Sequence, residues 1–139
     1  MFNIERFIEA QDKVYSNVVN ELKNGKKKTH WMWYIFPQHV ALGFSDISFK
    51  YGIKSIDEVK CYISNPILKE RYIECCNILL TLESNDSESI FGEIDSMKLK
   101  SSLTLFKFVD KENESLYNKL LKKFYNGEEC NLTLQLLNR

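Results

Sequence analysis

Apolar residues recur at steps of three and four along most of the chain, which is the pattern of amphipathic α-helices. The first such stretch begins behind Asn3, a residue type that caps helix N-termini, and reaches Gly25, a type that ends helices. We predict one helix between them. Its apolar stripe consists of Phe7, Ile8, Val14, Tyr15, Val18, Val19 and Leu22.

One polar side chain, Gln11, stands in this stripe where the spacing requires an apolar residue. A buried amide needs hydrogen-bond partners. Two interpretations follow: Gln11 ties elements of the core together, or it faces a ligand pocket.

The segment 30–38 is dense in aromatic residues and contains both tryptophans, Trp31 and Trp33. Its periodicity fits a helix and a strand equally well. Pro37 disfavours helical geometry at Phe36, so we expect the element to end there. A loop and a short turn closed by Gly52 are expected to follow.

Capping residues predict the remaining helices. Ser55 opens a capping box, and Asn65 followed by Pro66 starts the next helix. Asp95 or Ser96 and then Asn113 are the expected caps further on. The predicted stretches are 55–63, 66–80, 96–109, 114–127 and 131–137. The chain is therefore predicted to be all-α, a single domain spanning 1–139 with about seven helices.

Composition supports this fold class. Glycine and proline number 5 and 2 in 139 residues, too few for the turns of an all-β domain. The four cysteines form no Cys-x-x-Cys pair and are interpreted as free thiols. No apolar run is long enough to cross a bilayer, and no signal-peptide pattern opens the chain, so we expect a cytoplasmic protein without membrane contact.

Net charge is zero, with 19 basic and 19 acidic residues, which argues against nucleic acid as a partner. The charges are nevertheless segregated. The segment 22–45 contains lysines and no acid, whereas 72–97 contains a run of acids without a base between Tyr72 and Met97. The two segments are either solvated faces or a complementary pair that meets in the fold, or the basic one recognises an anion.

His30 is the candidate general acid or base, since imidazoles titrate near neutral pH. The alternative is a packed histidine in an aromatic core. Lys98 lies one helical turn before Ser102, and with Ser101 the three form a candidate phosphate clamp or an exposed helix surface. No P-loop, dinucleotide-binding glycine pattern or metal-ligand spacing is present, and we expect neither cofactor nor metal.

Several motifs resemble an uncharacterised bacterial family, domain of unknown function eighteen-ten, whose members are often labelled calpastatin. They are His30 to Gln38, Leu42-Gly43 with Ser45, Ile90-Phe91-Gly92 and Lys98 to Phe106. The resemblance covers essentially the whole chain. It implies a small, mostly helical cytoplasmic protein and brings no established reaction. Asn65 stands where the family usually has histidine, and Cys130 stands near a usual aspartate, so a mechanism that needs either side chain is not supported.

Our leading hypothesis is a pocket for a small phosphorylated, nucleotide-like molecule of the NAD or ADP-ribose type. Trp31 and Trp33 would stack on it, and Lys28 and Lys98 would neutralise its phosphate. Gln11, Gln38, Ser101 and Ser102 complete the expected ligand-binding set. If the protein is an enzyme, hydrolysis of a glycosidic or phosphate-ester bond is expected.

The second hypothesis is a protein-interaction or regulatory module in which the aromatic segment is core or partner surface. It predicts no polar-lined concavity around His30. Nucleic-acid binding is the third and weakest hypothesis. Composition leaves the oligomeric state open.

Overall fold

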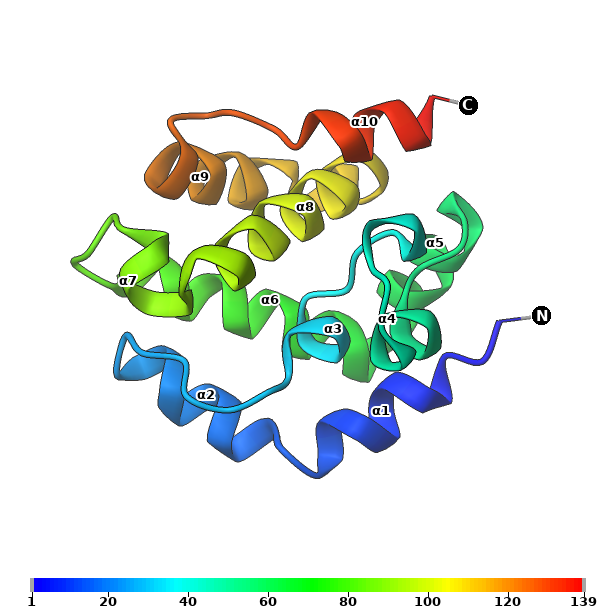
Figure 1. Ribbon diagram of the computed structural model, residues 1–139, viewed down its shortest axis with the longest axis horizontal. Helices are drawn as coiled ribbons and strands as arrows, with labels where there is room; N and C mark the ends of the chain where they lie inside the picture. Colours follow the sequence, from blue (N-terminus) through cyan, green and yellow to red (C-terminus); the bar gives the residue numbers. More distant parts are fainter. Residues whose placement is uncertain (1, 139) are drawn as a thin grey trace.

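The computed structural model describes residues 2–138, which fold almost entirely into helices (Figure 1). The longer helices are α1 (Glu5–Asp12), α2 (Tyr15–Lys23), α5 (Ile56–Ser64), α6 (Pro66–Thr81), α8 (Glu93–Val109), α9 (Glu114–Tyr125) and α10 (Asn131–Leu137). The shorter ones are α3 (Met32–Ile35), α4 (Asp46–Tyr51), α7 (Ser87–Phe91) and the 3-10 helices η1 (Val40–Leu42) and η2 (Lys111–Asn113). Within residues 2–138 no strand forms. The predicted all-α fold with about seven substantial helices is confirmed.

Several boundaries agree with the capping chemistry. Asn65 Oδ1 accepts hydrogen bonds from the backbone amides of Ile67 and Leu68, and Pro66 is the first residue of α6. Ser55 Oγ accepts from the Glu58 amide at the start of α5. These caps satisfy backbone donors that have no partner inside their own helices.

The aromatic segment 30–38, whose periodicity fits a helix and a strand equally well, contains one helical turn, α3. This helix ends at Ile35, and Phe36 leaves helical geometry with φ −120° and ψ 75°. The prediction that Pro37 ends the element is therefore confirmed. The turn expected near residues 47–51 is a short helix, α4, with a capping box between Ser45 and Ser48.

The single N-terminal helix predicted from Asn3 to Gly25 is wrong. The chain forms α1 and α2, which diverge at Lys13 and Val14 (Figure 1), and Ile4 rather than Asn3 is the N-cap, without a side-chain bond. Buried Gln11 supplies the physical reason, since its bonds hold the end of α1 to neighbouring elements while α2 packs along α6.

Two predicted caps, Asp95 and Ser96, do not act as caps. Gly92, at φ 82°, is the N-cap of α8, and it ends α7 in the same step. Asp95 and Ser96 lie inside the first turns of α8, where Ser96 Oγ contacts Ser87 Oγ at 2.5 Å. Asn113 is the N-cap of α9, as predicted, but its side chain makes no capping hydrogen bond and its amide donates to Asp110 instead.

The helices share one hydrophobic core whose centre is a set of aromatic rings. Tyr72 and Phe106 stack with centroids 4.0 Å apart, and Tyr62 meets Phe106 edge-on at 5.3 Å. Helix α8 crosses this core and contacts α5, α7, α9 and α10 (Figure 1). It therefore links the N-terminal half of the chain to the C-terminal half.

The four cysteines are free thiols, as predicted. Cys75 and Cys76 lie buried in α6, and burial raises the pKa of the Cys75 thiol to about 12. Among residues 2–138, no helix combines the length and the apolar character that crossing a membrane requires. The cytoplasmic location stays a prediction.

Candidate functional site

A pocket of about 220 Å³ lies where residues 27–34 face the first turns of α4 and α8. Three stretches distant in sequence thus build one concave surface. We call it the His30 pocket, and its lining consists of Lys27, His30, Trp31, Met32, Trp33, Tyr34, Ser45, Ile47, Asp95 and Lys98.

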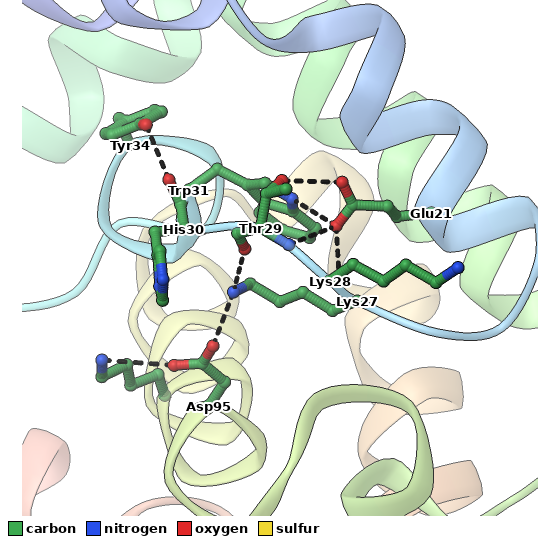
Figure 2. Close-up of polar contacts among 9 residues, drawn as sticks. Glu21, Lys27, Lys28, Thr29, His30, Trp31, Tyr34 and Asp95 are labelled. Carbon is green, nitrogen blue, oxygen red and sulfur yellow. Dashed lines mark hydrogen bonds and ion pairs between the residues drawn. The ribbon is translucent and has the colours of Figure 1, made fainter.

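A buried carboxylate on α2 holds the segment that carries the pocket residues (Figure 2). Glu21 accepts hydrogen bonds from the Lys28 amide at 2.6 Å, the Thr29 amide at 3.0 Å, the Thr29 hydroxyl at 2.7 Å and Trp31 Nε1 at 3.0 Å. Burial by itself raises the pKa of Glu21, but these hydrogen bonds outweigh it and lower the pKa to about 2. Glu21 is therefore ionised at neutral pH and fixes the backbone between α2 and α3.

Asp95 joins the basic segment to the acidic one. Its Oδ2 lies 2.8 Å from Lys27 Nζ, and its Oδ1 lies 3.2 Å from Lys98 Nζ. Burial raises the pKa of Asp95, whereas its contacts with both lysines lower it, and the net direction is downward. Two ammonium groups and one carboxylate leave one net positive charge in the pocket.

The two lysines are held to different degrees. The Lys27 side chain is 6% exposed, and its Nζ also donates to the Thr29 carbonyl at 2.5 Å. The Lys98 side chain is 27% exposed and has the longer contact with Asp95. Lys98 is therefore the cation with freedom to turn toward an incoming anion.

His30 is exposed at the mouth of the pocket. Its backbone carbonyl accepts a hydrogen bond from the Tyr34 hydroxyl at 2.8 Å. Figure 2 shows the imidazole on the side of the loop that faces Asp95. Among the described lining residues, His30 is the titratable side chain engaged in neither a hydrogen bond nor an ion pair.

Both tryptophans lie in the wall of the pocket and are buried, at 1% exposure for Trp31 and 7% for Trp33. Lys27 Nζ lies 4.9 Å from the Trp31 ring centroid, and Lys98 Nζ lies 6.0 Å from that of Trp33. The indole rings thus support the two cations and offer little free face to a ligand.

Gln11 ties the core and does not line the His30 pocket. Its Nε2 donates to the Tyr34 carbonyl at 2.7 Å and to the Tyr62 hydroxyl at 3.0 Å, while its Oε1 accepts from Arg71 at 3.3 Å. The first interpretation of this residue therefore matches the geometry.

Lys28 and Gln38 also lie outside the pocket. Lys28 is exposed, and its side chain points away from His30 in Figure 2, so Lys27 presents the ammonium group instead. Gln38 is 2% exposed next to the bridge between His39 and Ile53, and its Nε2 has no hydrogen-bond partner in the described chain.

The two serines of α8 have structural partners. Ser102 Oγ lies 2.8 Å from the Tyr72 hydroxyl inside the core. Ser101 Oγ donates to the Met97 carbonyl and contacts Cys130 Sγ at 3.3 Å. Of the predicted binding set, the fold brings together His30, Trp31, Trp33 and Lys98, and it separates Gln11, Lys28, Gln38, Ser101 and Ser102 from them.

Sequence reasoning missed six of the lining residues: Lys27, Asp95, Met32, Tyr34, Ser45 and Ile47. Charge segregation was a signal for the first two, because a meeting of the basic and acidic segments was one of the alternatives. That alternative is realised at Lys27 and Asp95, whose ion pair is 2.8 Å long. The pattern could not specify which residues would meet.

A larger groove of about 790 Å³ lies along the outer face of α6, between Lys23 and Asn113. Its floor includes Ile73 and Ile78, and it contains none of the predicted site residues. Both are lined by charged residues, but the smaller His30 pocket has the uncommitted imidazole beside the Lys27–Asp95–Lys98 cluster, so it is the candidate site.

Comparisons with known proteins place the chain in a family. The family described as "Protein of unknown function (DUF1810)" matches residues 1–137. The chain belongs to this DUF1810 family. It is also similar to a solved structure, that of the conserved hypothetical protein Rv1873 from Mycobacterium tuberculosis, with 40% sequence identity and a TM-score of 0.96 over 99% of this chain and 98% of that one. The comparison with curated proteins gives no match.

The family membership confirms the resemblance found in the sequence motifs. It also places the present fold beside a solved structure of closely similar shape. Neither description includes a ligand or a reaction.

Proposed function

We propose that the His30 pocket binds the phosphate of a small phosphorylated, nucleotide-like molecule, such as a derivative of NAD or ADP-ribose. The observation that carries the proposal is the cluster of Lys27, Asp95 and Lys98, which leaves one net positive charge beside an uncommitted imidazole. The alternative hypothesis, an interaction module, predicts no polar-lined concavity around His30. The presence of such a pocket favours ligand binding over that alternative.

The cluster is suited to a phosphate because its parts are already positioned. Lys27 is fixed against Trp31 and Asp95, so it contributes a stationary positive charge. Lys98 can leave Asp95 and donate to a phosphate oxygen, and Asp95 keeps its contact with Lys27 meanwhile. An ammonium acts on phosphate as a point charge and needs no bidentate geometry.

Replacing Lys98 by alanine tests the binding proposal. Hydrogen bonds to charged groups contribute about 1.5–3 kcal/mol, and Lys98 is partly exposed, so Lys98→Ala is expected to weaken ligand affinity about tenfold. Isothermal titration calorimetry with ribose 5-phosphate, ADP-ribose and NAD measures the change.

The matched control for this variant is Lys111→Ala. Lys111 also pairs with an acid three residues away, Glu114, but it lies in η2, beyond the C-terminal end of α8, and outside the pocket. The control should bind as the unmodified protein does. Equal weakening in both variants, or no binding by the unmodified protein at millimolar ligand, contradicts the proposal.

Hydrolysis is the reaction class that we propose for this site, with His30 as general acid or base. The imidazole is exposed at the pocket mouth and has no competing bond, so it can exchange a proton with water or with a leaving group. His30→Ala is expected to lower turnover of ADP-ribose derivatives 100-fold or more, on the order of the usual contribution of a general acid or base, with a small effect on binding.

Product formation is measured by chromatography of the nucleotides after incubation with each protein. His30→Ala and Lys98→Ala should have different effects, because the first lowers turnover and the second weakens binding. Turnover that survives in His30→Ala contradicts the catalytic role and leaves the binding proposal intact.

A further inference from the structure

Asp95 gives the His30 pocket an anion of its own. Its two carboxylate oxygens contact different ammonium groups, Lys27 Nζ at 2.8 Å and Lys98 Nζ at 3.2 Å. Figure 2 shows this carboxylate turned toward Lys27 and the loop that carries His30. Burial raises the pKa of Asp95, but the contacts with the two lysines outweigh it and hold the pKa below its usual value, so the group is ionised at neutral pH. Lys98, the cation that turns toward a phosphate in the proposed function, therefore already has an anionic partner.

The helix keeps this partner next to Lys98. Asp95 and Lys98 are three residues apart on α8, a spacing that brings two side chains together on one face of a helix. The two side chains are 20% and 27% exposed, so water and salt screen their attraction less than that of a fully exposed pair. An anion from solution must take Lys98 away from this contact before it can bind there.

The charge of the incoming anion decides whether the exchange is favourable. A carboxylate or a phosphate diester has one negative charge, the same charge that Lys98 gives up when it leaves Asp95. Such an anion gains little to offset the freedom that it loses on binding. A phosphate monoester has nearly two negative charges at neutral pH, and its second charge is attracted by the net positive charge of the Lys27, Asp95 and Lys98 cluster.

The size of the pocket also favours a terminal group. Pockets that enclose a complete small ligand measure roughly 300–1,000 Å³, whereas the His30 pocket measures about 220 Å³. A terminal phosphate enters such a volume with part of its sugar. An internal diphosphate needs room for a further group on each side.

Resting on the proposed function, we propose that Asp95 is an internal competitor for Lys98 that restricts the His30 pocket to ligands with a terminal phosphate monoester. Lys98 leaves Asp95 for the phosphate, and Lys27 keeps its contact with Asp95. The ligand class is thereby narrowed. NAD and ADP-ribose carry one charge on each phosphorus of their diphosphate, so they fit the site as derivatives with an added phosphate monoester.

The test compares two probes that differ by one methyl group and one negative charge. They are ribose 5-phosphate and its methyl ester at the phosphate, measured by isothermal titration calorimetry at about pH 8, above the second pKa of about 6 of a phosphate monoester. The unmodified protein is expected to bind ribose 5-phosphate at least about tenfold more tightly than the methyl ester. Asp95→Asn is expected to bind ribose 5-phosphate about tenfold more tightly than the unmodified protein does, and to bind the methyl ester measurably.

Two variants are the controls. Glu114→Gln also removes a carboxylate that pairs with a lysine three residues away, Lys111, but this pair lies outside the pocket. Its affinities should equal those of the unmodified protein. Asp95→Glu keeps the negative charge and should gain affinity for neither probe.

The outcomes distinguish the two proposals. Equal affinities for both probes in the unmodified protein overturn the restriction to monoesters. Unchanged or weaker binding of ribose 5-phosphate by folded Asp95→Asn overturns the competitor. If neither probe binds to either protein, the proposed function itself fails.

A second measurement uses the unmodified protein, because Lys27 loses its carboxylate partner in Asp95→Asn. In a crystal structure with ribose 5-phosphate, Lys98 Nζ should donate to the phosphate and should have left Asp95 Oδ1. Lys27 Nζ should still contact Asp95 Oδ2. A bound phosphate with Lys98 still paired to Asp95 overturns the competitor.

Discussion

Replacing Glu21 by glutamine is expected to lower the free energy of unfolding by about 2–3 kcal/mol at pH 7. The carboxylate accepts four hydrogen bonds, two of them from backbone amides of Lys28 and Thr29. A glutamine has one carbonyl oxygen for these donors, and its amide group would face another donor. Urea unfolding followed by circular dichroism measures the loss.

The same carboxylate predicts a pH dependence. The pKa of Glu21 is lowered from 4.5 to about 2 by folding, so its contribution to stability is complete above about pH 4.5 and is lost as the pH falls through about 2. The difference between the unmodified protein and Glu21→Gln should therefore shrink steadily over that range. A difference that is independent of pH contradicts an ionised Glu21 in the fold.

A surface carboxylate is the control. Glu128 is 74% exposed and lies 3.5 Å from Lys100, so Glu128→Gln should change stability little at any pH. Glu21→Gln should also weaken ligand binding at pH 7, because the segment that carries Lys27 and His30 loses its anchor. Glu128→Gln should not.

Replacing Gly43 by alanine is expected to cost about 2–3 kcal/mol of stability, at the upper end of what overpacking costs. The added methyl would lie 2.3 Å from Ser48 Cβ, 2.5 Å from Ser48 Oγ and 2.6 Å from Trp33 Cζ2. Such distances force the loop, the start of α4 or the Trp33 ring to move. Thermal unfolding measures the cost.

A second substitution shows whether this clash is the cause. Ser48→Gly removes two of the three close contacts, so the double variant Gly43→Ala with Ser48→Gly should be more stable than the sum of the two single effects requires. If the two losses of stability simply add in the double variant, contact with Ser48 is not what destabilises Gly43→Ala. Ser48→Gly by itself removes the capping box with Ser45, so the stability of this single variant has to be measured as the reference.

Local signals predicted the helices well where one residue type determined the boundary. Asn65 with Pro66 and Pro37 after α3 are such cases, since capping and the restriction before proline act over a few residues. The prediction of one continuous N-terminal helix failed because no local residue type marks the break between α1 and α2. Residues 7 to 22 keep a helical period, and it is the tertiary contacts of Gln11 with Tyr34 and Tyr62 that hold the end of α1 in place.

The candidate site was predictable in part. His30 and the tryptophans stood out as an unusual cluster, and their neighbourhood follows from their closeness in sequence. The sequence predicts Asp95 as a helix cap because aspartate commonly is one, whereas its pairing with Lys27 depends on how α8 crosses the core. The spacing of the α8 serines predicts ligand groups, yet Ser102 Oγ hydrogen-bonds with the Tyr72 hydroxyl, a partner that no local pattern reveals.

The position of α8 has a consequence for how the site comes into being. Lys27 and Asp95 are roughly 70 residues apart, so closing the loop between them is entropically costly and depends on the contacts of α8 across the core. The helices near the N-terminus can form without that closure. The charged cluster therefore requires α8 to be packed across the core, and an anion that bound there would stabilise the folded chain over any state in which α8 is detached.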